Sequence, residues 1–508
     1  MSQAMAPPGP DFSHGIELVA IPLEGTLSGR VGDEPVLLSR LGAELYAVGG
    51  ACTHYGGHLA DGHVGRRSVR CPLHHACFDL KTGSVLRAPA LDPLDRWEVE
   101  VESGRAFVRR KLEPVERTKS RNADVSRIVI IGGGAAGLAC AVELRRLGFA
   151  GELTILSADK NAPYDRPNLS KDYLAGTAPE EWLPLRSDDW YSEKRVDLRL
   201  STNVTQIDPG TRSIQCASGD RLPFDRLLMA TGSEPNRLRA PGFDAPNVFT
   251  LRTIVDARAI AERAKPGSRA VLIGASFIAM EAAAALRHRK VEVDIVAPEQ
   301  VPFDQVLGTE LGNRLQSIHE QNGVRFHLGT GASAFDGRSV SLSSGETLEA
   351  DFVLVGIGVR PRIDLARAAG MEVDHGVLVD EYLHTNVPGI YAAGDIAQYP
   401  DPVSGQRVRI EHWVVAERQG EVAAANMLGE KKRFRSAPFF WTDQAGTMVR
   451  YVGHAKSWDA SKVEGDIAGD SFSVRYFSEG EHRATATVGR DHENLQDELK
   501  LESFAEAR

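Results

Sequence analysis

Short apolar runs separated by turn residues dominate the first 111 residues of the chain. The runs include IELVAI, EPVLLSR, ELYAVGG and RWEVEVES, and Gly and Asp-Gly stand between them. Short strands broken by such residues are typical of a small all-β unit. The pattern predicts an all-β domain over residues 13–112. A disordered tail rich in Pro, Ala and Gly (1–12) is predicted before it, and a charged linker (113–126) after it.

After residue 126 the pattern changes to alternating strands and helices. The apolar run RIVIIG (127–132) leads into GGGAAG, a helical stretch and a second apolar run, LTILS. RAVLIG (269–274) begins the same order of elements again. Repeats of this kind predict two α/β domains, each with a parallel pair of strands. The chain then returns to short strands and ends in an acidic helical segment, which predicts a C-terminal α+β domain.

The composition of the 508-residue chain is that of a globular protein with several domains, 42% hydrophobic and 25% charged. Its net charge of −10 argues against general binding to nucleic acid or to an anionic membrane. No apolar run reaches the roughly 18 residues that a spanning helix needs, and the chain does not begin with a signal-peptide pattern. We therefore expect a cytoplasmic protein, whose five cysteines form no disulfide framework.

Histidines and cysteines concentrate in one part of the predicted β domain. Cys52-Thr-His54 and Cys71-Pro-Leu-His74 each supply one thiolate and one imidazole. A zinc site with two Cys and two His is one interpretation, but zinc fingers usually pair Cys with Cys and His with His along the chain. One Cys and one His in each segment suits a [2Fe–2S] cluster of the Rieske type, whose two irons have unlike ligands.

The stretches ACTHYGGHLADG and CPLHHACFDLKTG resemble the two cluster loops of Rieske ferredoxins. The resemblance implies that Cys52 and Cys71 bind one iron of the cluster and that His54 and His74 bind the other. His75 stands where the family usually has glycine, and it is the alternative to His74. The spacing favours His74.

The motif Gly132-x-Gly134-x-x-Gly137 follows the first α/β strand and opens its helix. In this context the first glycine makes a tight turn, the second lets the backbone approach a pyrophosphate, and the third lets helix and strand pack closely. The predicted loop residues are Gly132, Gly134, Ala135, Ala136 and Gly137. An acidic residue roughly 20 positions further on should bind the adenosine ribose, and Asp159 is the nearest.

The loop GASFIA (274–279) stands at the same place in the second α/β unit. It keeps only the first glycine of the motif, but its serine and alanine are small enough for close approach to a dinucleotide. The predicted contacts are Gly274, Ser276, Phe277 and Ile278. Ala297 ends the next strand where an acidic residue is usual, and Glu299 is predicted to take its place. No arginine directly follows that strand to bind a 2′-phosphate, which favours NADH over NADPH.

Three further segments, LLMATGSEP, GIGVRP and GIYAAGDIA, complete a resemblance to flavoprotein reductases with two dinucleotide-binding domains. It implies an FAD-binding domain in two parts (127–252 and 377–434), an NAD(P)-binding domain between them (253–376) and a C-terminal reductase domain (435–508). The cofactor-site residues that it adds are Ala230, Thr231, Gly232, Gly358, Gly394 and Asp395. The last two are implied to bind the ribityl and pyrophosphate part of FAD.

The two cysteines outside the predicted β domain, Cys140 and Cys216, are too far apart in sequence for the dithiol motif of the disulfide reductases. Instead, PYDRPNLSK (163–171), RIEHWVVAERQG and FFWTDQAGT resemble oxygenase-coupled ferredoxin reductases and apoptosis-inducing-factor-like flavoproteins. The resemblance implies a catalytic pair, Lys171 and Glu281, in which the lysine stabilises the reduced flavin. The other implied flavin-site residues are Arg166, Pro167, Glu411, His412, Trp413 and Trp441. A core position is an equal alternative for Trp441.

A Rieske domain fused to such a reductase most resembles the Rieske-containing, apoptosis-inducing-factor-like reductases. A nicotinamide gives two electrons as a hydride, a Rieske cluster takes one, and flavin handles both. The resemblance implies electron transfer from NADH through FAD to the cluster and on to a one-electron acceptor, which is either a protein (a ferredoxin or an oxygenase component) or a small oxidant. The alternatives are an NADH oxidase or quinone or dye reductase with an accessory cluster, and a redox-responsive signalling flavoprotein. The sequence is compatible with a monomer and with a homodimer.

Overall fold

The computed structural model describes residues 9–115 and 124–507. Residues 1–8 of the predicted tail and most of the predicted linker lie outside these ranges. The prediction of disorder is wrong for residues 9–12. Asp11 caps a short 3-10 helix, η1 (Phe12–His14), and the apolar side chain of Phe12 is fully buried in the core of the β domain.

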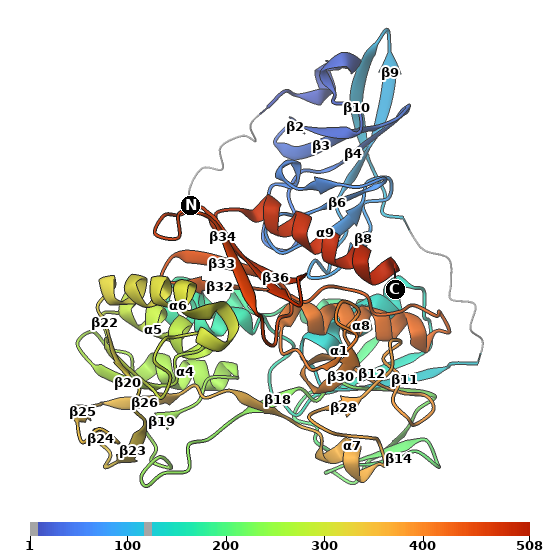
Figure 1. Ribbon diagram of the computed structural model, residues 1–508. Coiled ribbons are helices and arrows are strands. Elements are labelled where there is room, and N and C mark those ends of the chain that lie inside the picture. Colours follow the sequence, from blue (N-terminus) through green and yellow to red (C-terminus); the bar gives the residue numbers. More distant parts are fainter. Residues whose placement is uncertain (1–8, 116–123, 508) are drawn as a thin grey trace.

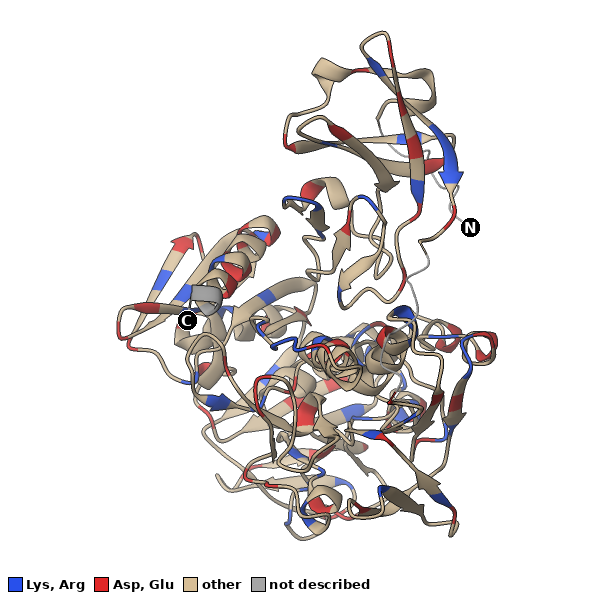
Figure 2. Cartoon of the chain, turned by 90° about the vertical axis from the view of Figure 1, so that its right-hand side faces the viewer, with Lys and Arg blue, Asp and Glu red and all other residues tan. Residues whose placement is uncertain are grey.

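The N-terminal domain is all-β, as predicted, and contains two antiparallel sheets. The larger sheet has the order β1-β10-β9-β4-β3-β2, with strands β1 (Ile16–Glu17), β2 (Gly25–Val31), β3 (Glu34–Leu41), β4 (Glu44–Gly49), β9 (Arg96–Glu102) and β10 (Arg105–Leu112). The smaller sheet contains β5 (His63–Val64), β6 (Ser68–Arg70), β7 (Cys77–Asp79) and β8 (Val85–Arg87). The smaller sheet lies nearer to the rest of the chain (Figure 1). Acidic and basic segments are interleaved along the strands of this domain (Figure 2).

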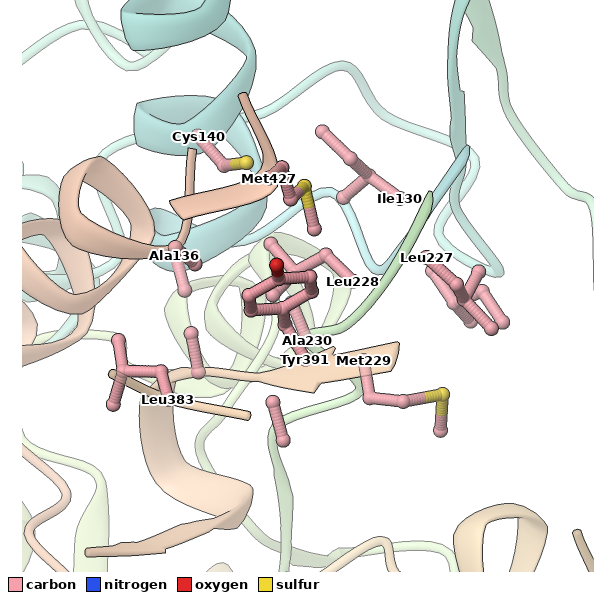
Figure 3. Close-up of a cluster of buried hydrophobic side chains, with 14 of the residues drawn as sticks. Ile130, Ala136, Cys140, Leu227, Leu228, Met229, Ala230, Leu383, Tyr391 and Met427 are labelled. Carbon is pink, nitrogen blue, oxygen red and sulfur yellow. The ribbon is translucent and has the colours of Figure 1, made fainter. Parts of the chain in front are cut away.

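The first α/β domain contains a five-stranded parallel sheet in the order β13-β12-β11-β17-β29. Its strands are β11 (Arg127–Ile131), β12 (Glu152–Leu156), β13 (Val196–Arg199), β17 (Arg226–Met229) and β29 (Ile390–Ala392). Helix α8 (Trp413–Met427) packs along α1 (Ala135–Arg146). Gly420 permits this packing, since a Cβ there would lie 2.3 Å from the carbonyl oxygen of Ala136. Cys140 is fully buried in this core (Figure 3).

The second α/β domain repeats the plan with a parallel sheet in the order β19-β26-β20-β21-β22. Its strands are β19 (Val248–Phe249), β20 (Arg269–Ile273), β21 (Glu292–Ala297), β22 (Val324–Leu328) and β26 (Phe352–Val355), and its helices include α4 (Ile254–Arg263), α5 (Phe277–His288) and α6 (Asp304–Gln321). The parallel pairs β11–β12 and β20–β21 confirm the two predicted strand–helix–strand units. The chain crosses between the two domains twice, and the crossing strands β18 (Ser233–Pro235) and β27 (Val359–Pro361) pair with each other.

Smaller elements complete the two α/β domains. Two three-stranded antiparallel sheets extend from them, β14 (Val204–Asp208) with β15 (Ser213–Cys216) and β16 (Arg221–Pro223), and β23 (Ala332–Phe335) with β24 (Ser339–Leu342) and β25 (Thr347–Glu349). The remaining elements are β28 (Val377–Leu378), β30 (Ala397–Pro400), β31 (Arg407–Val408), η4 (Pro167–Ser170), η5 (Glu180–Trp182), η6 (Gly394–Ile396), α2 (Asp172–Ala175), α3 (Asp188–Glu193) and α7 (Asp364–Ala368).

The C-terminal domain is a five-stranded antiparallel sheet with one long helix. The sheet has the order β32-β33-β36-β35-β34, with strands β32 (Phe439–Gln444), β33 (Thr447–Gly453), β34 (Ala460–Gly465), β35 (Phe472–Ser478) and β36 (Glu481–Val488). Helix α9 (Asp491–Ala507) packs on this sheet and lies next to the N-terminal β domain (Figure 1). Within the part of the chain that the structure describes, no helix combines the length and the apolar character needed to cross a membrane.

Candidate functional site

A cavity of about 1320 Å³ is lined by both α/β domains and the C-terminal sheet. Small-molecule pockets usually measure about 300–1,000 Å³, so this cavity has room for an extended ligand such as a dinucleotide. The predicted residues that line it are Gly132, Gly134, Ala135, Ala136, Asp159, Arg166, Pro167, Lys171, Ala230, Thr231, Gly232, Phe277, Ile278, Glu281, Gly394, Asp395, Glu411, His412, Trp413 and Trp441. Among the described residues no cysteine lines it, so a dithiol has no counterpart here.

Five predicted cofactor residues do not line this cavity: Gly137, Gly274, Ser276, Glu299 and Gly358. The first two have packing roles. A Cβ at Gly137 would lie 1.9 Å from the carbonyl oxygen of Gly132, and one at Gly274 would lie 2.4 Å from the carbonyl oxygen of Gly356. The other three residues are exposed. Their contacts with a dinucleotide cofactor therefore stay predictions.

One end of the cavity is suited to an anion. The N-terminus of α1 lines it through Gly134 and Ala135, and helix N-termini bind phosphate through free backbone N–H groups. Arg166 lies beside this N-terminus, since a Cβ at Gly134 would lie 3.9 Å from its guanidinium, and its buried Nε has no hydrogen-bond partner among the described residues. Burial lowers the pKa of Arg166, and the like charge of Arg252 lowers it further. An arginine with an unpartnered, buried Nε beside a helix N-terminus fits the pyrophosphate of FAD.

Asp159 is held in a fixed orientation at the cavity wall. Its Oδ1 accepts hydrogen bonds from the backbone N–H and the side-chain amide of Asn161, at 3.0 and 2.9 Å. Its Oδ2 accepts a hydrogen bond of 2.9 Å from the Tyr164 hydroxyl. These bonds fix the carboxylate at the place where the sequence motif predicts a ribose contact.

The predicted catalytic pair is formed across a domain boundary. Lys171 Nζ lies 2.7 Å from Glu281 Oε2, which also accepts a hydrogen bond of 2.5 Å from the Ser170 hydroxyl. Thr442 of the C-terminal sheet donates to the other carboxylate oxygen at 2.5 Å. The side chain of Glu281 is 4% exposed and that of Lys171 16%. A cation held at the cavity wall by a buried carboxylate fits the predicted role beside a flavin ring.

The four predicted cluster ligands meet as two pairs. Cys52 and Cys71 are buried with their thiols in contact, and His54 Nδ1 lies 3.2 Å from His74 Nδ1. Burial lowers the pKa of His54 to about 4 and that of His74 well below its ordinary value, so both imidazoles are neutral, as metal ligands must be. In the described residues no group of three or more His, Cys, Asp or Glu side chains could hold one metal ion. Two separate pairs fit a binuclear cluster better than a four-coordinate zinc ion.

The structure separates the two candidate histidines. His74 faces His54, whereas the His75 ring stacks on Phe439 at 4.0 Å between ring centroids, and its Nδ1 lies 3.2 Å from the Glu498 carboxylate. His75 has φ of 62°, in the left-handed region. This is the region that glycine adopts freely, which accounts for glycine at this position in the resembling loops.

Trp441 joins the histidine pair to the large cavity. Its ring centroid lies 4.1 Å from that of His74 and 6.1 Å from that of His54, and its side chain lines the cavity. Tyr55 stacks on His54 at 4.1 Å, and its hydroxyl donates to Asp165, next to the cavity residue Arg166. The histidine side of the cluster site therefore faces the cavity.

A buried ionic network holds the β domain on the C-terminal helix. Glu498 of α9, fully buried, lies 3.0 Å from Arg70 of β6 and 2.7 Å from the equally buried Arg418 of α8. Glu502, one turn further on, lies 2.6 Å from Arg87 of β8. The acidic helical end of the chain is visible in the sequence, but its basic partners lie 80 or more residues away, and no sequence pattern indicates the pairing. The network was therefore not predictable from sequence.

Comparison with protein families divides the chain into three matches. Residues 19–98 match the family described as Rieske [2Fe-2S] domain, residues 126–420 match pyridine nucleotide-disulphide oxidoreductase, and residues 439–500 match the reductase C-terminal family. The three matches correspond to the β domain, the two α/β domains and the C-terminal sheet.

Individual relatives include human apoptosis-inducing factor 3, which is 35% identical over 91% of this chain and 79% of its own length. Rhodocoxin reductase of Rhodococcus erythropolis is 36% identical over 69% of this chain and 83% of its own length. Among solved structures, the covalent putidaredoxin reductase–putidaredoxin complex superposes with a TM-score of 0.72 at 32% identity, covering 74% of this chain and 93% of that one.

Proposed function

Because the chain belongs to the pyridine nucleotide-disulphide oxidoreductase family and carries a Rieske domain, we propose that it transfers electrons from NADH through FAD to its own [2Fe–2S] cluster. From there they pass to a one-electron acceptor protein, a ferredoxin or an oxygenase component. The chain is an NAD(P)H-dependent flavoprotein oxidoreductase of the ferredoxin reductase type. Within this type of enzyme, we propose NADH as the donor and a ferredoxin or an oxygenase component as the acceptor.

The contact between Trp441 and His74 carries this proposal. If the fused cluster took no part in the flavin chemistry, we would not expect its histidine side to face the flavin cavity. Instead, one aromatic side chain, Trp441, contacts the ligand histidine and lines the cavity. Fusion also keeps the cluster at a high effective concentration beside the reductase.

The residues around the cavity have separate tasks in this proposal. Arg166 and the N-terminus of α1 bind the pyrophosphate, and Asp159 binds the ribose. Lys171, anchored by Glu281, places a positive charge at the ring. When bound, FAD takes up the two electrons of a hydride and passes them on singly.

The preference for NADH rests on the end of β21. Ala297 is the last residue of this strand, and Glu299 follows it on the surface. A carboxylate at this place binds a free 2′-hydroxyl and repels a 2′-phosphate, while NADPH sites supply an arginine. Glu299 therefore supports NADH as the donor.

Anaerobic titration of the holoprotein with NADH, and separately with NADPH, tests the proposal when flavin absorbance and cluster EPR are followed together. We expect the flavin and then the cluster to be reduced by NADH, with a much weaker response to NADPH. The variant Cys52→Ser, which cannot bind the cluster normally, serves as the control for the EPR signal. Flavin that is reduced while the cluster stays oxidised would contradict the proposal and favour an oxidase or dye reductase. Reoxidation of the reduced cluster by an added ferredoxin tests the acceptor class.

A further inference from the structure

A continuous chain of hydrogen bonds leads from the Lys171–Glu281 pair to a histidine in the second α/β domain. Thr442 Oγ1 lies 2.5 Å from Glu281 Oε1, and Gln444 Nε2 lies 2.6 Å from Thr442 Oγ1. Gln444 Oε1 in turn lies 2.9 Å from His319 Nε2. Lys171 precedes α2, Glu281 belongs to α5, Thr442 and Gln444 to β32, and His319 to α6. These hydrogen bonds therefore connect all three reductase domains.

The side chains that form this series of hydrogen bonds are almost completely shielded from solvent. The exposed fraction is 0% for His319 and Gln444, 1% for Thr442 and 4% for Glu281. Apolar side chains of similar size would avoid the cost of removing these polar groups from water. Hydrogen bonds between buried polar groups offset this cost and fix the orientation of the side chains that make them.

The protons available on these side chains allow only one direction of donation along the hydrogen bonds. Thr442 has a single hydroxyl proton. If the Gln444 amide were reversed, its oxygen would face Thr442 Oγ1, and that proton could not serve both Gln444 and Glu281. The amide nitrogen of Gln444 must therefore donate to Thr442, and Thr442 must donate to Glu281.

The same direction determines the protonation of His319. Because Gln444 presents its oxygen to His319, Nε2 must carry a proton. Burial lowers the pKa of His319, which favours the neutral ring. Its Nδ1, which has no hydrogen-bond partner among the described residues, is then an acceptor. The series of hydrogen bonds therefore ends at a neutral His319 whose proton is on Nε2.

We propose that Thr442, Gln444 and His319 are positioning residues that hold the Glu281 carboxylate in one orientation and thereby keep the Lys171 ammonium at the flavin ring. The inference rests on the proposed function, because it takes Lys171 as the cation beside the flavin. No proton moves along the chain. Its contribution is to prevent the carboxylate from rotating.

The contacts of Lys171 show why this orientation matters. Ser170 and Lys171 bond to Oε2 of Glu281, and Thr442 bonds to Oε1. Without the Thr442 hydroxyl, Oε1 loses its donor and the carboxylate is free to turn. The other partner of Lys171 Nζ is the carbonyl oxygen of Pro167, at 3.2 Å. The ammonium is then expected to move toward this carbonyl and away from its position beside Glu281.

Thr442→Val and Thr442→Ser in the full-length holoprotein provide a matched test. Valine keeps the shape of threonine without the hydroxyl, and serine keeps the hydroxyl. At saturating NADH without oxygen, we expect flavin reduction to be about tenfold slower in Thr442→Val, as befits a lost hydrogen bond to a charged group. We also expect a more negative flavin potential, an unchanged KM for NADH, and nearly normal behaviour in Thr442→Ser. A Thr442→Val protein with the normal rate and potential would overturn the proposal.

A second measurement needs no Thr442 variant and remains available if Thr442→Val does not fold. Nitrogen-15 NMR of the histidine-labelled holoprotein reports which ring nitrogen of His319 is protonated, with His319→Gln used to assign the signal. We expect a proton on Nε2 and none on Nδ1. A proton on Nδ1 alone, which would leave Nε2 as an acceptor, would refute the direction of the chain. Failure of the cluster to accept electrons in the unmodified protein would refute the proposed function but would leave both readouts interpretable.

Discussion

The indole ring of Trp441 lies 4.1 Å from the imidazole ring of His74, centroid to centroid, and its side chain also lines the cavity that is predicted to hold the flavin. A single side chain therefore links the two predicted redox sites. Tyr55, the other aromatic residue against the histidine pair, stacks on His54 but does not line the cavity. Trp441 is therefore the more direct connection between the histidine pair and the cavity.

Replacement of Trp441 should separate the two electron-transfer steps. In Trp441→Leu, we expect the rate of flavin reduction by NADH to change much less than the rate of cluster reduction, because Lys171 and Glu281 are unchanged. Reduction of the cluster should be about tenfold slower, equivalent to ~1.4 kcal/mol in activation free energy. Trp441→Phe keeps an aromatic ring and should lie between the two. Stopped-flow absorbance at flavin and cluster wavelengths measures both steps. Equal slowing of both would indicate a general packing defect instead.

The adjacent histidines, His74 and His75, should respond differently to substitution. His74→Ala removes the imidazole beside His54 and should abolish the Rieske EPR signal. His75→Asn places a residue that tolerates a positive φ at that position, and the cluster signal should remain. Loss of the ring stacked on Phe439 should lower the melting temperature of His75→Asn. Loss of the cluster signal from His75→Asn alone would reverse the assignment of the ligand.

Local patterns were sufficient to predict the architecture. The apolar runs predicted the paired parallel strands, because each strand, turn and helix is specified by residues close together in sequence. The glycine loop illustrates this: Gly132 has φ of 117°, and a Cβ at Gly137 would collide with the carbonyl oxygen of Gly132, as the motif requires. Phe12 shows that amino-acid composition alone does not predict which residues are disordered. A tail rich in Pro and Gly was predicted to be disordered, but one apolar side chain anchors its described end.

Long-range partners could not be predicted from sequence. The ion pair of Glu498 with Arg418 joins residues from separate helices, and its formation depends on how α8 and α9 pack. The contact of Trp441 with His74 depends on the placement of a whole domain. For Trp441 the sequence left a cavity position and a core position equally open, because an aromatic residue suits both. Only the domain arrangement distinguishes them.

Glu299 should control the choice between NADH and NADPH. It lies on the surface two residues beyond β21, where a carboxylate would bind the ribose hydroxyls of NADH and repel a 2′-phosphate. In Glu299→Ala, we expect the ratio of kcat/KM for NADH to that for NADPH to fall about tenfold, or ~1.4 kcal/mol. Gln300→Ala, at the next exposed position, is the control. An unchanged ratio in Glu299→Ala would show that the ribose is recognised elsewhere.

Attachment of the β domain should weaken in acid through Glu498. Burial alone would raise the pKa of Glu498, but the positive charges of Arg418 and its other partners outweigh burial and hold the pKa well below its ordinary value. A carboxylate with a lowered folded-state pKa stabilises the fold above its unfolded pKa, and this stabilisation is lost as the pH falls from there toward the folded-state pKa.

Glu498→Gln removes the titrating group and leaves Arg418 buried without its counter-charge, which should cost about 3–5 kcal/mol near neutral pH. Melting temperatures measured from neutral to acidic pH should therefore start lower in Glu498→Gln and decline less steeply than in the unmodified protein. Glu100→Gln, which removes an exposed ion pair with Arg109, should follow the unmodified protein, since surface pairs contribute little. Parallel curves for Glu498→Gln and the unmodified protein would show that Glu498 does not produce the acid sensitivity.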